Sequence, residues 1–237
     1  MSIVSANMQA VELAIQTAAE AAGRPRSAIQ LLAVSKTFPC EAVLDAMQTG
    51  QRAFGENYVQ EGVDKIAAVA VAAPSESLEW HFIGPIQSNK TRPIAENFAW
   101  VHAIDRLKIA QRLSEQRPEG LPPLNVCLQV NISGEDSKSG VAPADLPELA
   151  RQVAALPHLR LRGLMAIPEA ETDAAKQHLP FARLRLLYEQ LQADGLPLDT
   201  LSMGMSGDLA AAVAEGATIV RIGSAIFGAR TYPKDAT

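Results

Sequence analysis

Lys36 is the first residue whose type and place point to chemistry. It ends a short apolar segment, Ile29 to Lys36, which is typical of a strand buried on both faces. One interpretation is a rim lysine whose ammonium reaches water. The other is a reactive amine, because desolvation lowers the pKa of a lysine and the neutral amine forms a Schiff base with an aldehyde. Position alone leaves both interpretations open.

Two segments near the end of the sequence, SMGMSGD (202–208) and RIGSAIFG (221–228), are rich in small residues. Such residues let backbone N–H groups approach a ligand closely, and serine adds a hydroxyl donor. The small residues in question are Gly204, Ser206, Gly207, Gly223 and Ser224. They indicate either a phosphate-binding site or ordinary turn glycines and helix caps.

Arg221 lies inside the apolar segment TIVRIG. If its side chain faces inward, the guanidinium needs an acceptor across the sheet or a ligand atom, because a buried unpaired charge is very costly. If it faces outward, its role is structural. A lysine, a phosphate site and an arginine that converge on one place match an aldehyde cofactor carrying a phosphate and a ring nitrogen. That cofactor is pyridoxal 5′-phosphate (PLP).

The elements that must position these groups alternate between short apolar segments and helical spacing. After an N-terminal helix with apolar residues from Val11 to Ala18, eight such units follow. Their apolar segments are 29–36, 52–54, 78–84, 99–104, 124–132, 159–167, 199–203 and 218–223. This alternation predicts an α/β fold, a closed parallel (β/α)₈ (TIM) barrel with an extra N-terminal helix. The alternative is an open doubly wound sheet, but no strand is followed by G-x-G-x-x-G.

In a barrel of this kind, ligands bind at the carboxyl ends of the strands, and phosphate sites use the loops after strands seven and eight. Lys36 and both small-residue segments are therefore expected at the same end. The length of 237 residues and 48% hydrophobic content favour a single domain over residues 1–237.

Charge and composition argue against several partners. The 21 basic and 26 acidic residues give a net charge of −5 without long runs of either sign, so nucleic acid is not expected as a partner. The N-terminal residues carry no basic region and no apolar stretch of secretory length, so we expect no secretory leader, and no segment has the apolar length of a membrane span. Cys40 and Cys127 are too few and too far apart for a disulfide framework, which favours the cytoplasm and a role as core residues.

The four histidines show no spacing typical of metal ligands, so we expect no metal site. His81 and His102 fall on predicted strands. We interpret them as hydrogen-bonded core imidazoles, with an acid or base role as the alternative.

With these residues in view, the chain resembles the pyridoxal-phosphate homeostasis proteins and, more distantly, the barrel domain of alanine racemase, in the fold-type III group. The similarity covers nearly the whole sequence. Seven blocks carry it: LLAVSKTFP (31–39), FGENYVQE (54–61), WHFIGPIQSNK (80–90), QVNISGEDSKSG (129–140), RGLMAIP (162–168), LSMGMSGD (201–208) and RIGSAIFG (221–228).

The resemblance implies a role for each site residue. Lys36 is expected to hold PLP as a Schiff base, and Asn57 to approach the phenolic side of the cofactor. The phosphate is expected on Ser206, Gly223 and Ser224, with Arg221 facing the pyridine nitrogen. The family often has threonine where this chain has Ser224, which keeps the hydroxyl.

Arg221 has a chemical consequence in this arrangement. A guanidinium stays charged, so the ring nitrogen facing it stays unprotonated and the cofactor is a poor electron sink. Related racemases also take a second acid or base, a tyrosine, from a C-terminal domain that we do not expect here. Tyr232 is the one loose candidate. We therefore expect a PLP carrier in cofactor homeostasis and delivery, not an enzyme with strong activity.

Two rival functions remain at this point: a slow amino-acid racemase or other fold-type III PLP enzyme, and a barrel binding another phosphorylated metabolite. Expected partners are PLP and PLP-acceptor apoenzymes, without membrane contact, and the chain is expected to be a monomer. Lys138 is either a solvated loop lysine or a second amine that relays the aldehyde.

Overall fold

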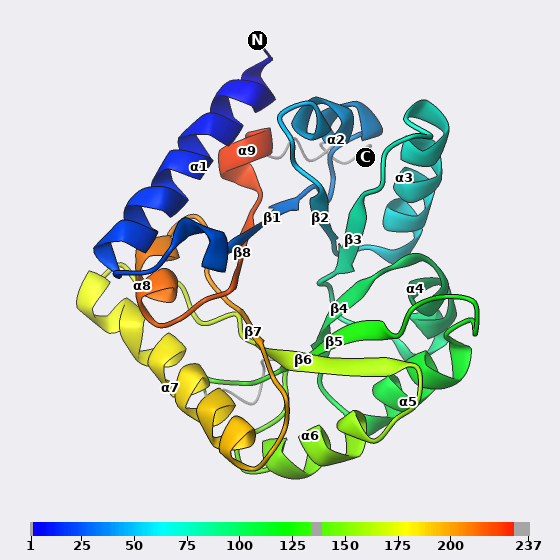
Figure 1. The fold of residues 1–237 in the computed structure, drawn as a ribbon, viewed down its shortest axis with the longest axis vertical. Helices are drawn as coiled ribbons and strands as arrows, with labels where there is room; N and C mark the ends of the chain where they lie inside the picture. Colours follow the sequence, from blue (N-terminus) through cyan, green and yellow to red (C-terminus); the bar gives the residue numbers. More distant parts are fainter. Residues whose placement is uncertain (1, 134–138, 230–237) are drawn as a thin grey trace, which may run out of the picture.

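The computed structural model describes residues 2–133 and 139–229, and the strands among them form one closed parallel barrel. The strands follow each other around it in chain order, and the last pairs with the first (Figure 1). They are β1 (Gln30–Val34), β2 (Ala53–Glu56), β3 (Glu79–Phe82), β4 (Trp100–Ile104), β5 (Leu124–Gln129), β6 (Leu159–Met165), β7 (Thr200–Ser202) and β8 (Ile219–Ile222). The predicted (β/α)₈ barrel is confirmed, and the open-sheet alternative is excluded.

Helices surround the barrel as an outer layer (Figure 1). They are α1 (Ile3–Ala21), α2 (Cys40–Met47), α3 (Val59–Ala72), α4 (Thr91–Asn97), α5 (Leu107–Gln116), α6 (Leu146–Ala154), α7 (Ala174–Ala193), α8 (Leu209–Ala214) and α9 (Ser224–Phe227). Short 3₁₀ helices lie at Arg26–Ala28 and Ser88–Lys90. No helix in the described ranges has the length and apolar character needed to cross a membrane.

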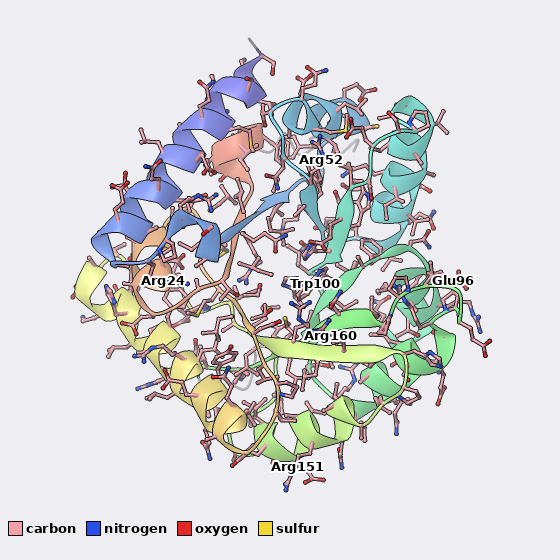
Figure 2. All side chains as sticks on the ribbon, in the orientation of Figure 1. Arg24, Arg52, Glu96, Trp100, Arg151 and Arg160 are labelled. Carbon is pink, nitrogen blue, oxygen red and sulfur yellow. The ribbon has the colours of Figure 1, made fainter. Side chains whose placement is uncertain are left out.

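The strands are buried on both sides, because their side chains point alternately into the barrel interior and toward the helix layer. All five residues of β4 are buried, including Trp100. Figure 2 shows Trp100 near the middle of the barrel, whereas Glu96 on α4 and Arg151 on α6 lie on the outside of the helix layer. This is the burial expected from short, continuous apolar segments in the sequence.

The predicted N-terminal helix is present as α1 and packs against α8 and α9 (Figure 1). Its buried face includes Val11 and Ile15. Asn7 Nδ2 on α1 donates to the carbonyl oxygen of Ile226 on α9 at 2.8 Å. Beyond the helix, Arg24 donates to the carbonyl oxygen of Val213 on α8 at 2.7 Å. The extra helix therefore supports the two short helices that follow β7 and β8.

Candidate cofactor site

A cavity of about 300 Å³ lies at the carboxyl ends of the strands. All six residues predicted from the sequence to bind a cofactor line it: Lys36, Asn57, Ser206, Arg221, Gly223 and Ser224. Its other lining residues are Val34, Ile83, Ile167, Met205 and Gly207. The fold therefore brings together predicted residues that are far apart in the sequence, such as Lys36 and Ser224, which are 188 positions apart.

Lys36 lies two residues beyond the end of β1 and is half-buried. The preceding residue, Ser35, is fully buried, and the backbone N–H of Ser35 donates to the carbonyl oxygen of Gly55 at 3.0 Å. The parallel pairing of β1 with β2 thus continues to the residue before Lys36. This places the lysine at the mouth of the barrel, next to the residues that follow β2.

Asn57 follows β2 directly. Its side-chain oxygen Oδ1 is buried and has no hydrogen-bonding partner among the described residues. The loop after β3 approaches the backbone of Asn57 closely, since a Cβ atom on Gly84 would lie 2.2 Å from the Asn57 carbonyl oxygen. Glycine is therefore needed at position 84 to keep Asn57 in place. A buried polar atom without a partner is costly, so a ligand donor at this point would be stabilising.

The small-residue segments meet at the same cavity. Ser206 and Gly207 lie in the loop between β7 and α8, while Gly223 and Ser224 lie at the start of α9. A Cβ atom on Gly223 would come within 3.2 Å of the carbonyl oxygen of Val34, so glycine keeps β8 close to β1 here. The first N–H groups of a helix have no acceptor within the helix. Together with two serine hydroxyls, they can bind the oxygens of an anion.

Arg221 on β8 faces inward, which settles the alternative left open by the sequence. Its side chain is buried and donates to neutral acceptors. Nη1 donates to the carbonyl oxygen of Ser202 at 2.6 Å and to Ser202 Oγ at 2.8 Å, and Nη2 donates to the carbonyl oxygen of Ala166 at 2.8 Å. Burial lowers the pKa of Arg221 to about 10, which still leaves the guanidinium charged at neutral pH.

A chain of buried hydrogen bonds continues from Arg221 into the barrel. Ser202 Oγ lies 2.7 Å from His102 Nδ1, and His102 Nε2 lies 2.9 Å from His81 Nδ1. His81 Nε2 lies 2.9 Å from Glu79 Oε1. His81 and His102 are fully buried and hydrogen-bonded, as expected for core imidazoles.

The ionisation of Glu79 determines the direction of every bond in this chain. The hydrogen bond from His81 lowers the pKa of Glu79 to about 2, so its carboxylate can only accept. Burial lowers the pKa values of His81 and His102, so both rings are neutral. His81 therefore carries its proton on Nε2 and His102 on its own Nε2, and the Ser202 hydroxyl donates to His102 Nδ1. Ser202 Oγ is then left to accept from Arg221.

The sequence did not point to Ser202 and Ala166 as the groups that hold Arg221. A signal was present for Ser202, which is a polar residue in a short buried strand, but not for Ala166, which acts through its backbone.

The remaining tyrosines, the buried cysteine and Lys138 either do not line the cavity or lie outside the described residues. Tyr58 is exposed, and the Tyr188 hydroxyl on α7 donates to the carbonyl oxygen of Leu198 at 2.9 Å. Cys127 is buried, and burial raises the pKa of its thiol to about 12, as expected for a core cysteine. Lys138 and Tyr232 lie outside the described residues. Within the described part, no group of three or more His, Cys, Asp and Glu side chains is arranged to hold a metal ion.

Comparison with known proteins gives the family. Residues 6–231 match the model for the alanine racemase N-terminal domain. The pyridoxal phosphate homeostasis protein of Pseudomonas aeruginosa is 64% identical over 232 residues, which are 98% of each chain. The protein of that name from Vibrio cholerae is 57% identical over 236 residues, covering 100% of both. The chain belongs to the pyridoxal phosphate homeostasis protein family.

A solved structure has the same fold. PipY of Synechococcus elongatus, solved with PLP bound, is 37% identical and superposes with a TM-score of 0.82. The match covers 95% of this chain and 100% of PipY. The family resemblance carried by the seven sequence blocks is thus confirmed.

Proposed function

We propose that this chain binds PLP in the cavity at the carboxyl ends of the strands and acts in PLP homeostasis and delivery without strong catalysis. The observation that carries the proposal is the convergence of one amine, one guanidinium and two small-residue loops on a single cavity. The names of the relatives and the PLP bound to PipY support it.

The residues present fit this cofactor. Lys36 supplies an amine for the aldehyde, and the Asn57 side chain, whose Oδ1 is buried, offers a polar contact for the phenolic side. Ser206, Gly223 and Ser224 offer hydroxyl and backbone donors for a phosphate. The cofactor supplies a reactive aldehyde. For Schiff-base formation, the Lys36 ammonium releases a proton, a C=N bond replaces the C=O bond, and one water molecule leaves.

Arg221 argues against strong catalysis. Its guanidinium is charged and can only donate hydrogen bonds, so it favours an unprotonated ring nitrogen. A cofactor in that state withdraws electrons weakly, which disfavours most amino-acid chemistry.

The cavity lining supports the same conclusion. Among the described residues that line it, the side chains that ionise are Lys36 and Arg221. Racemisation needs an acid and a base on opposite faces of the substrate carbon. One lysine and one permanently charged arginine are a poor pair for that task.

We propose that residues 1–237 act as a single PLP-binding domain, as a monomer in the cytoplasm, and that PLP-acceptor apoenzymes receive the cofactor. The two cysteines support a reducing compartment, since Cys40 and Cys127 are both free thiols.

Borohydride reduction of the PLP-loaded protein, followed by peptide mapping, tests the proposal. We expect the label on Lys36, and we expect the absorption band of the bound cofactor to vanish in Lys36→Ala. The control is Lys108→Ala, which removes an exposed lysine on α5 and should leave the band unchanged.

Two other results would overturn the proposal. If no absorption band of a bound adduct appears when PLP is added, the ligand of the cavity is a different phosphorylated metabolite. Rapid exchange of a substrate α-hydrogen with deuterium would mean that the chain is an enzyme of the racemase type.

A further inference from the structure

The residue after Lys36 has an unusual backbone conformation. Thr37 has a φ of 67°, and among the described residues only His158 shares this property without being glycine. The left-handed region is unfavourable for a β-branched side chain, so surrounding contacts must hold Thr37 there. This strained residue directly follows the lysine that is proposed to form the Schiff base.

Glu61 on α3 holds the strained residue. Its Oε1 accepts a hydrogen bond from the backbone N–H of Thr37 at 2.5 Å. The same oxygen accepts a hydrogen bond from Lys65 Nζ, one turn further along the helix, at 2.9 Å. The backbone on the carboxyl side of Lys36 is thereby tied to α3.

Lys65 ties the other side of Lys36 to the same helix. Its Nζ donates to the carbonyl oxygen of Ser35 at 2.8 Å and to Glu56 Oε1 at 2.6 Å. The Ser35 hydroxyl donates to that same Glu56 oxygen at 2.6 Å. All three protons of the Lys65 ammonium are thus used. One bond holds Ser35 directly, and the Glu61 oxygen that accepts another bond also holds Thr37.

This charged cluster lies between the barrel wall and α3. Lys65 and Glu56 are both buried, and Glu56 Oε2 has no hydrogen-bonding partner among the described residues. α3 comes this close because position 62 is glycine: a Cβ atom there would lie 2.8 Å from Phe98 Cζ and 3.2 Å from Glu56 Cβ. A buried ion pair with an unused carboxylate oxygen is a weak source of stability, because desolvation offsets the attraction. A positioning role explains it better.

We propose that Glu56, Glu61 and Lys65 form a positioning cluster that holds the backbone on both sides of Lys36 and thereby aims the Lys36 amine into the cavity. The proposal rests on the proposed function, in which Lys36 binds the aldehyde. Glu61 is the critical member, because it keeps Thr37 in its strained conformation.

Stopped-flow measurement of adduct formation with PLP tests the cluster. Glu61→Ala should slow the formation rate constant about tenfold, the effect of losing one hydrogen bond to a charged acceptor. Its side chain is 30% exposed and Lys65 keeps two other acceptors, so we expect the variant to fold. Glu61→Gln keeps an oxygen acceptor and should stay within about threefold of the unaltered protein.

The matched control is Glu76→Ala. It removes a glutamate of similar exposure that pairs with Arg52 at 3.1 Å, away from the cavity. We expect an unchanged rate constant. Equal rates in Glu61→Ala and Glu76→Ala would overturn the proposal.

Rescue by glycine separates positioning from a general structural effect. Thr37→Gly removes the steric reason for leaving the left-handed region. In the Glu61→Ala background it should therefore restore most of the lost rate, giving a non-additive double-mutant cycle. A double variant as slow as Glu61→Ala would show that Glu61 does not act through Thr37, and would overturn the proposal.

Hydrogen exchange in the unaltered protein gives a test that needs no variant. The Thr37 amide should be protected, and a fast-exchanging amide would overturn the positioning cluster. Failure of the proposed function looks different, because the unaltered protein would then form no adduct on Lys36 at all.

Discussion

Lys36 and Arg221 lie at neighbouring strands of one barrel, but different kinds of group surround them. Next to Lys36, the positioning cluster is charged, lies outside the barrel wall and contacts the backbone on both sides of the lysine. Arg221 instead has neutral acceptors inside the barrel, connected through two imidazoles to a distant carboxylate.

The difference follows from what each residue is proposed to do. Lys36 must present an amine that gains and loses a proton, so its backbone is held and no carboxylate of the cluster lies in the cavity lining. Arg221 must stay charged and face a ring nitrogen, so neutral acceptors orient it without drawing it into an ion pair. We therefore expect the positioning cluster to control the rate of adduct formation at Lys36. We expect the histidine chain to control the orientation of the Arg221 guanidinium.

The largest effect is expected from Lys65→Met. Removing the ammonium leaves the Glu56 carboxylate buried without its partner, which should cost about 3–5 kcal/mol of the free energy of unfolding. Urea denaturation at neutral pH measures the loss. Adding Glu56→Gln should recover part of it, because the double variant has no buried charge at this place. A loss below about 1 kcal/mol would contradict the assignment of a buried ion pair.

A smaller effect is expected from His102→Leu. It leaves the proton of the Ser202 hydroxyl without its acceptor and His81 Nδ1 without its donor, and should lower the free energy of unfolding by about 2–3 kcal/mol. Adduct formation at Lys36 should keep its rate, while the ¹⁵N shift of the ring nitrogen in labelled PLP should move. His178→Leu removes a half-exposed histidine on α7 paired with Glu215 and serves as the control. If His102→Leu formed the adduct as slowly as Glu61→Ala, the proposed difference between the two regions would be wrong.

The smallest effect concerns acid stability and Glu79. The hydrogen bond from His81 lowers the pKa of Glu79 from 4.5 to about 2 in the folded protein. A lowered pKa means that this contribution to stability is present above pH 4.5 and is lost as the pH falls toward 2. The side chain is 41% exposed, so screening should reduce the contribution to about 1 kcal/mol.

Comparison of unfolding free energies for the unaltered protein and Glu79→Gln between pH 5 and pH 2 measures this contribution. The difference between the two should shrink as the pH falls. A constant difference over this range would mean that Glu79 is not the ionised end of the histidine chain.

The barrel could be predicted from the sequence because its signal is local. Apolar segments such as Ile29 to Lys36 recur with helical spacing between them, and eight repeats close a parallel sheet. Lys36, Ser206, Arg221, Gly223 and Ser224 were expected at one end of the barrel for a related reason. Each lies near the carboxyl end of such a segment, and the barrel brings those ends together, whereas Asn57 was expected only from the family resemblance.

Contacts made across the fold were decided by the tertiary structure alone. The inward direction of Arg221, its backbone acceptors Ser202 and Ala166, and the tie from Glu61 to Thr37 join positions that no local pattern connects. The sequence determined which elements form and which polar residues lie at their ends, because periodicity and residue type act locally. Only the closed barrel decided how those residues are held, because hydrogen-bond geometry depends on the strands and helices that become neighbours.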